Sequence, residues 1–207
     1  MPEHRIRLYR HPLSGHAHRA ELMLALLGLP AELVDVDLAS GAHKAPDFLA
    51  LNPLGQVPVL QDGAVTLADS NAILVYLARK YDTPGHWYPS EATVAADVQR
   101  WLSLAAGQLA AGPALARVIN VFGLKADGDR ARSIAGALFG YMNTHLADRE
   151  FLVGTHATIA DVALYSYTAH APEGGVSLQP YPAIQAWLCR IEALPGFVAM
   201  QATPLAA

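Results

Sequence analysis

Apolar and polar positions change their spacing along the first 80 residues in a way that predicts alternating strands and helices. Residues 6–9 form a short apolar run among arginines, and residues 32–38 alternate apolar with acidic side chains, so both segments are predicted strands. Between them, residues 18–27 carry apolar side chains at helical spacing, and Gly28 follows as a helix stop. Because a strand–helix–strand crossover is right-handed, we expect the two strands to be parallel.

A hairpin and a further helix complete this first pattern. Residues 57–67 contain two apolar runs joined by Asp62-Gly63, and Asp-Gly between apolar runs is a strong local signal for a β-hairpin. Ser70 then begins a segment with apolar residues at helical spacing. Since the two strands of a hairpin are antiparallel, the predicted four-stranded sheet is mixed.

The pattern changes at residues 81–90, which contain two prolines and a glycine and are typical of a linker. Beyond them no strand pattern recurs. Four segments predict helices: 91–121, 129–146, 158–170 and 181–194. We therefore predict an α/β domain over residues 1–82, a linker over 83–90 and an all-helical (all-α) domain over 91–207.

Composition excludes several classes of protein. The 207 residues are 53% hydrophobic and only 15% charged, which excludes a disordered chain and predicts a large buried core. The longest charge-free runs, such as 101–116, reach about 16 residues, fewer than the roughly 20 that a membrane-spanning helix needs, so we expect no membrane protein. A net charge of −4 without basic clusters argues against nucleic-acid binding.

Cysteine and histidine positions limit the metal chemistry. Cys189 is the only cysteine, so neither an internal disulfide nor a zinc site of several cysteines is expected. His11, His16 and His18 lie close together, but no acidic ligands surround them and no Gly-x-Ser-x-Gly motif of a serine hydrolase is present, so we expect no metal. The N-terminal residues lack the apolar core of a signal peptide, which predicts a cytoplasmic location.

Two motifs occur in order, with the hairpin between them and a helix after the second. Residues 52–60 are Asn-Pro-Leu-Gly-Gln-Val-Pro-Val-Leu, and residues 67–73 are Leu-Ala-Asp-Ser-Asn-Ala-Ile. Through these motifs the chain resembles the glutathione S-transferase superfamily over nearly its whole length, and residues 41–49 are similar to its theta- and phi-like classes. The resemblance implies a thioredoxin-like N-terminal domain, a helical C-terminal domain, and a cytoplasmic homodimer that joins glutathione to a small hydrophobic electrophile.

The resemblance also implies where the middle of glutathione binds. The Val57-Pro58 peptide is expected to be cis, and the backbone of Val57 would pair with the cysteinyl backbone of glutathione like a short added strand. Gln56 would add hydrogen bonds to the tripeptide. Taken alone, a Val-Pro step at a hairpin edge needs no ligand to explain it.

The two ends of glutathione are assigned through the same resemblance. Ser70 opens a helix whose N-terminus would hold the γ-glutamyl carboxylate, although serine is also a common helix N-cap. Asp69, where the family usually has glutamate, would face the γ-glutamyl ammonium. His43 and Lys44 would hold the glycyl carboxylate, whereas without the resemblance they would be interpreted as a solvated loop.

The implied reaction needs a group that stabilises the glutathione thiolate, because a free thiol has a pKa of about 8.5. A charge-assisted hydrogen bond contributes about 1.5–3 kcal/mol, which corresponds to about 1–2 pKa units. Ser14, between the first strand and the first helix, is the candidate, since serine-type members of the family place their active serine in this turn. The alternatives are that Ser14 is only a helix N-cap and that Tyr9, on the strand, provides the hydroxyl.

The helical half carries one structural motif and candidate walls for an electrophile pocket. Thr158 and Asp161 have the spacing of a capping-box variant, which would start a helix and perform no chemistry. The candidate walls are Trp101, Leu104, Gln108, Arg117, Val118, Phe122 and Tyr165. Alternative functions are a specialised glutathione-dependent peroxidase, dehalogenase or isomerase, and a non-catalytic binding or scaffold protein.

Overall fold

The predicted mixed four-stranded sheet is confirmed by a computed structural model, in which residues 5–204 are described. Its strands are β1 (Ile6–Arg10), β2 (Ala31–Asp35), β3 (Val59–Asp62) and β4 (Val65–Ala68), in the spatial order β2-β1-β3-β4. β1 and β2 are parallel, as the right-handed crossover requires, and the other two neighbouring pairs are antiparallel.

The chain divides into two compact units. The first comprises Met1–Thr83 with Pro195–Gln201, and the second comprises Pro84–Leu194 with Ala202–Ala207. The hydrophobic pattern did not predict that a segment after the last helix belongs to the first unit. There the His18 ring nitrogen Nε2 donates a hydrogen bond to the carbonyl of Val198 at 2.9 Å.

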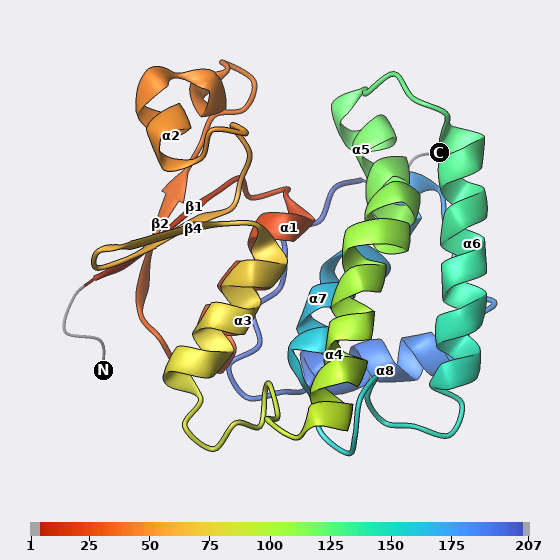
Figure 1. The fold of residues 1–207 in the computed structure, drawn as a ribbon. Helices are drawn as coiled ribbons and strands as arrows, with labels where there is room; N and C mark the ends of the chain where they lie inside the picture. The colour runs from red at the N-terminus through yellow and green to blue at the C-terminus, as the bar shows by residue number, and fades with distance from the viewer. Residues whose placement is uncertain (1–4, 205–207) are drawn as a thin grey trace. The chain divides into compact units, whose positions relative to one another are not determined.

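Two long helices cover one face of the sheet in the first unit. α1 (Gly15–Leu26) and α3 (Ser70–Tyr81) pack together there (Figure 1). Strand residues alternate between the faces, and the inward Ile6, Leu8 and Leu60 have no exposed surface. These apolar side chains form the hydrophobic core between the sheet and the two helices.

A short helix covers the opposite face. α2 (Pro46–Leu51) follows a 3₁₀ turn at Ala42–Lys44, and its Phe48 packs with Val36 and Val59. The hydrophobic pattern did not predict α2, because a helix of 6 residues with one buried side chain shows no measurable period.

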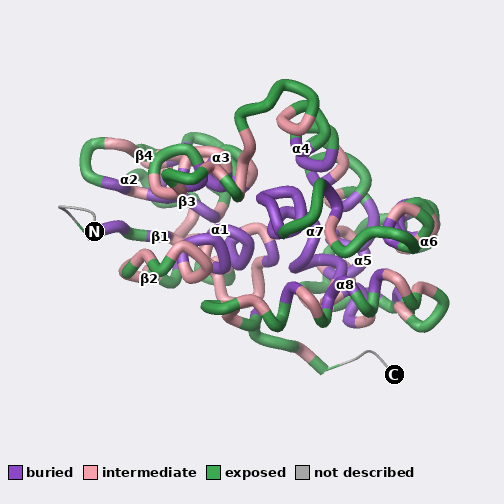
Figure 2. The backbone as a smooth tube through the Cα atoms, turned by 90° about the horizontal axis from the view of Figure 1, so that it is seen from below, coloured by how far each residue is buried: buried purple, intermediate pink, exposed green. Residues whose placement is uncertain are grey.

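The second unit is all-helical in its described part, as predicted. It contains α4 (Ala92–Leu104), α5 (Leu115–Phe122), α6 (Gly128–His145), α7 (Ile159–Ala169) and α8 (Pro182–Glu192), with a 3₁₀ turn at Ala171–Gly174. Every residue from Ile159 to Thr168 is buried, and Figure 2 shows α7 as a buried segment. A helix that is buried on all sides forms the core of its unit.

The helix predicted over 91–121 is a continuous helical run in three parts. Residues Ala105–Ala114, between α4 and α5, form a π-helix that contains Pro113, which lacks a backbone donor. Gly112 packs so closely on α6 that a Cβ there would lie 2.8 Å from the backbone nitrogen of Ala135. By length and composition alone, Ala92–Phe122 could cross a membrane, but a buried core helix meets the same criterion, and 44% of its most apolar stretch is buried.

Candidate functional site

The connections of the sheet bring four loops to one edge. β1 and β2 run in the same direction and end there at Arg10 and Asp35. The antiparallel β3 begins there at Val59, and β4 ends there at Ala68. The predicted glutathione-site residues of the first unit all lie in the segments that follow or precede these strand ends: Ser14, His43, Lys44, Gln56, Val57, Asp69 and Ser70.

Ser14 lies in the turn between β1 and α1 and is the N-cap of α1. Its Oγ accepts a hydrogen bond from the backbone N–H of Ala17 at 3.2 Å, and its own N–H donates to the carbonyl of His11 at 2.9 Å. A hydroxyl that accepts one bond still carries a proton to donate. The helix N-terminus adds positive potential at the same point. The capping role is therefore present and leaves the hydroxyl able to stabilise an anion.

The hydroxyl of Tyr9 is already used within the sheet. It donates to the side-chain oxygen Oε1 of Gln61 on β3 at 2.9 Å. The ring packs edge-on against Phe48 of α2, with 6.2 Å between the ring centroids. Tyr9 is therefore held between the sheet and α2 by contacts at both its ring and its hydroxyl.

The loop before β3 leaves one backbone unit open. The side-chain amide of the buried Asn52 donates to the carbonyl of Gln56 at 2.8 Å, and its oxygen accepts from the N–H of Leu54 at 3.1 Å. The Val57-Pro58 peptide that follows is cis. Within residues 5–204, neither the N–H nor the C=O of Val57 makes a hydrogen bond to the protein. Asn52 thus shapes a loop that exposes a free donor and a free acceptor.

The 3₁₀ turn after β2 packs against this loop. The Lys44 ammonium Nζ donates to the carbonyl of Leu54 at 3.0 Å. Gly55 has a φ of 59°, and a Cβ there would lie 2.7 Å from both the His43 carbonyl oxygen and Lys44 Nζ, so only glycine fits. The His43 ring nitrogen Nδ1 is buried without a hydrogen-bond partner in the described part of the chain. The sequence motif contained Gly55 but did not indicate this close approach.

The start of α3 differs by one residue from the predicted cap. Asp69, not Ser70, is the N-cap, and its Oδ1 accepts from the N–H of Ala72 at 2.9 Å. Asp69 has a φ of 71°, the one positive value of a residue other than glycine among residues 5–204. Such backbone strain often occurs at binding and active sites. Asp69 is exposed, whereas Ser70 is 5% exposed and is the first residue of the helix.

Arg19 is a site-supporting residue that the sequence analysis did not identify. It lies on α1 with 1% exposure, and its Nη1 donates to Ser70 Oγ at 3.1 Å and to Asn71 Oδ1 at 2.8 Å. A buried guanidinium thereby places a positive charge directly behind the N-terminus of α3. An arginine on the apolar side of a predicted helix was the available signal, because a charge is seldom buried without a partner.

Burial favours the neutral form of two histidines near Ser14, His16 and His11. Burial, with the charge of Arg19 as a second cause, lowers the pKa of His16 from 6.5 to about 3. Burial also lowers the pKa of His11. Among residues 5–204, no three His, Cys, Asp or Glu side chains lie together as a metal site. Helix N-termini, Arg19 and Lys44 contribute positive potential at this edge.

Three predicted pocket walls are core residues instead. Trp101 and Arg117 have no exposed surface, and Tyr165 is 3% exposed. Arg117 Nε donates to Glu173 Oε2 at 2.7 Å, so its charge is paired inside the second unit. The interpretation of these side chains as walls of a substrate pocket is therefore wrong.

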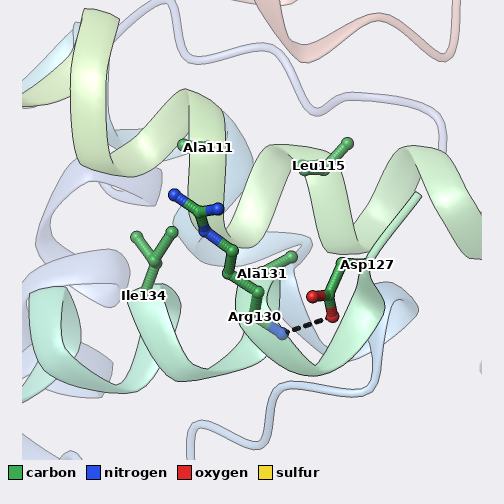
Figure 3. Close-up of a pocket in the computed structure, with 6 residues that line it drawn as sticks. All are labelled: Ala111, Leu115, Asp127, Arg130, Ala131 and Ile134. Atoms are coloured by element: carbon green, nitrogen blue, oxygen red, sulfur yellow. Dashed lines mark hydrogen bonds between the residues drawn. The ribbon is translucent and has the colours of Figure 1, made fainter.

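The second unit has an open cavity of about 300 Å³ between the π-helix, α5 and α6 (Figure 3). Its lining consists of Ala111, Leu115, Asp127, Arg130, Ala131 and Ile134. None of these residues belongs to the predicted glutathione site.

Comparisons with known proteins agree with this arrangement. Residues 4–79 match the family model "Glutathione S-transferase, N-terminal domain", and residues 104–195 match the model of the C-terminal domain. Human glutathione S-transferase theta-2 is 35% identical over 178 residues, which are 82% of this chain and 73% of that protein.

Solved structures give the same result. The glutathione S-transferase from Pseudomonas fluorescens is 34% identical, with a TM-score of 0.89 over 95% of this chain and 99% of that one. A glutathione transferase homologue from Drosophila mojavensis, solved with bound glutathione, is 28% identical, with a TM-score of 0.83 over 92% of this chain and 89% of that one. The chain therefore belongs to the glutathione S-transferase superfamily.

Proposed function

We propose that this chain, a glutathione transferase by its family, binds glutathione along the shared sheet edge and stabilises the thiolate with the Ser14 hydroxyl. The observation that carries the proposal is the backbone of Val57 at this edge, whose N–H and C=O have no hydrogen-bond partner in the described part of the chain. A free donor and acceptor of this kind can take the backbone of a peptide like an added strand. The cysteinyl unit of glutathione is such a backbone, and the side-chain amide of the exposed Gln56 adds a second polar contact.

The γ-glutamyl end of glutathione fits the start of α3. Its carboxylate would rest at the N-terminus of this helix, where the helix dipole favours an anion, with the buried charge of Arg19 behind Ser70. The exposed carboxylate of Asp69 would face the ammonium, since only its Oδ1 has a hydrogen-bond partner among the described residues. Opposite charges are thereby matched at both groups of this end.

The glycyl carboxylate fits the turn that contains His43 and Lys44. Lys44 has three N–H donors and uses one of them on Leu54, so others are available. Among residues 5–204 the buried Nδ1 of His43 has no hydrogen-bond partner, and a buried polar atom without one costs about 1–3 kcal/mol.

The reaction is the attack of the glutathione sulfur on an electrophilic atom of the second substrate. The thiol loses its proton to solvent, the lone pair of the thiolate forms the new bond to the electrophile, and any leaving group departs with the electrons of the broken bond. A hydrogen bond from Ser14 would lower the thiol pKa from about 8.5 by about 1–2 units, so that roughly a quarter to three quarters of the bound glutathione is thiolate at pH 7. Ser14 is favoured over Tyr9, whose hydroxyl donates to Gln61.

Family membership is also the basis on which we propose the substrate class, the role, the location and the oligomeric state. We assign a small hydrophobic electrophile as second substrate, a detoxifying role, a cytoplasmic location and a homodimer. Residues 1–82 would form the glutathione-binding domain, 83–90 the linker and 91–207 the helical domain. Sedimentation of the purified chain tests the homodimer directly.

The proposal is tested by binding and activity together. The full chain should be retained on immobilised glutathione and should conjugate glutathione to members of a panel of model electrophiles. Ser14→Ala should stay bound but lose about 10–100-fold in kcat/KM, the equivalent of the 1–2 pKa units above. Tyr9→Phe is the matched control and should keep its activity. Loss of activity in Tyr9→Phe with full activity in Ser14→Ala would overturn the assignment.

A further inference from the structure

Two exposed histidines lie side by side in the second unit, far along the chain from each other. His86 precedes α4 and His156 precedes α7. Their ring centroids are 5.5 Å apart, and their planes are inclined by 41°. Neither ring takes any part in the chemistry described above, so the pair needs a separate explanation.

Hydrogen bonds next to both histidines hold the two loops together. The N–H of Ile159 donates to the carbonyl of Trp87, the residue after His86, at 2.9 Å. Thr158, two residues after His156, caps α7 through a capping box with the buried Asp161. The backbone on each side of the pair is thus fixed before any ion binds.

A further contact prepares the ring of His156 to act as a ligand. Its Nδ1 lies 3.2 Å from the carbonyl oxygen of Ala157. Because a carbonyl only accepts, Nδ1 carries the proton and Nε2 of the neutral ring keeps its lone pair. Histidines that bind metals are commonly held by a hydrogen bond from the second ring nitrogen to a carbonyl or carboxylate.

The spacing of the rings fits a shared metal ion. A ligating ring nitrogen lies about 2.0–2.1 Å from Zn²⁺, which puts each ring centroid roughly 3.2 Å from the ion and two tetrahedrally arranged centroids roughly 5.2 Å apart. The observed 5.5 Å differs from this by a few tenths of an ångström. Both histidines are exposed, so water can reach an ion bound between them.

We propose that His86 and His156 together bind one divalent transition-metal ion, whose remaining ligands are water. Imidazole pairs suit Cu²⁺, Ni²⁺ and Zn²⁺ and do not suit Mg²⁺ or Ca²⁺, which prefer oxygen. Such an ion would link the segment before α4 to the start of α7. Because it binds the folded chain, it stabilises the second unit.

The test measures Ni²⁺ and Cu²⁺ binding to the full chain by calorimetry and thermal unfolding, with Mg²⁺ for comparison. Ni²⁺ should bind and raise Tm, and Mg²⁺ should do neither. His86→Gln and His156→Gln should each weaken Ni²⁺ binding roughly tenfold or more, because one ring loses the chelating help of the other. The double variant should be little weaker than either single one. His11→Gln, in the other unit, is the matched control and should bind like the wild type.

Electron paramagnetic resonance of bound Cu²⁺ gives a readout that does not depend on stability. The wild type should show two coordinating imidazole nitrogens and each single variant one. Independent, additive losses in the two single variants would indicate two separate sites and overturn the proposal. Unchanged affinity in both, or no Ni²⁺ binding to the wild type, would also overturn it.

Discussion

The N-termini of α3 and α7 each contain an aspartate and a residue with a side-chain hydroxyl. They differ in how many of these polar groups have hydrogen-bond partners within the protein. At α7, both oxygens of the buried Asp161 are used: Oδ1 accepts from the Leu152 N–H and the Trp187 indole, each at 2.9 Å, and Oδ2 accepts from Thr158. At α3, Asp69 is exposed and uses one oxygen, and Ser70 is backed by the charge of Arg19. A helix start whose polar groups are all satisfied inside the protein organises folding, whereas one that retains open groups beside a buried charge can receive a ligand.

The largest effect is expected at α7. Asp161→Ala would leave the Trp187 indole and two backbone N–H groups buried without a partner. The expected loss in unfolding free energy is about 3 kcal/mol or more, seen as a fall in Tm of roughly 6–12 °C. Thr158→Ser keeps the capping hydroxyl and should change Tm far less. An unchanged Tm in Asp161→Ala would show that this network does not stabilise the fold.

A smaller effect, on binding alone, is expected at α3. Asp69→Asn keeps an oxygen to cap the helix but removes the charge proposed to face the γ-glutamyl ammonium. Glutathione Kd should rise about tenfold, which corresponds to about 1.4 kcal/mol, while Tm stays the same. A glutathione analogue without the amino group should bind wild type and variant equally. If the variant also loses tenfold toward that analogue, Asp69 acts on another part of the ligand.

The sequence predicted those parts of the fold whose periodicity or turn signal is local. The helical spacing of apolar residues over 18–27 predicted α1, and the Asp62-Gly63 signal predicted the hairpin of β3 and β4. Asp62 itself does not lie in the turn: it is the last residue of β3 and 1% exposed, and its Oδ2 accepts from Tyr76, Lys80 and Tyr81 on α3. The pattern located the turn but did not indicate that Asp62 accepts hydrogen bonds from α3.

The unpredicted parts depend on contacts between residues far apart in the sequence. Arg19 meets Ser70 across 51 positions, so nothing near either residue indicates the pair. The cap of α3 was placed one residue late because aspartate and serine, both strong capping residues, stand next to each other. The seven predicted glutathione-site residues were proposed through family resemblance, and the sheet topology then supplied a physical reason why they share one edge.

A third effect is absent at neutral pH and emerges only in acid, as a change in how stability depends on pH. His16 has a folded pKa of about 3 against 6.5 when unfolded, so between these values the unfolded chain binds one more proton and stability falls as pH falls. His16→Gln should remove this contribution, making the pH slope of the unfolding free energy smaller by about one proton between about pH 6 and 4. Denaturant unfolding at a series of pH values measures the slope. Parallel curves for wild type and variant would show that His16 titrates normally in the folded chain.

The central claim is that the Ser14 hydroxyl holds the thiolate of bound glutathione. Its most direct test is the ultraviolet absorbance of the thiolate, titrated against pH with glutathione bound to the wild type, Ser14→Ala, Ser14→Gly and Ser14→Thr. Glycine keeps most of the capping stability, so it separates loss of the hydroxyl from loss of the helix cap. The account predicts a thiol pKa raised by about 1–2 units in both Ala and Gly variants and restored by Thr. An unshifted pKa in Ser14→Ala and Ser14→Gly, with glutathione still bound, would contradict it.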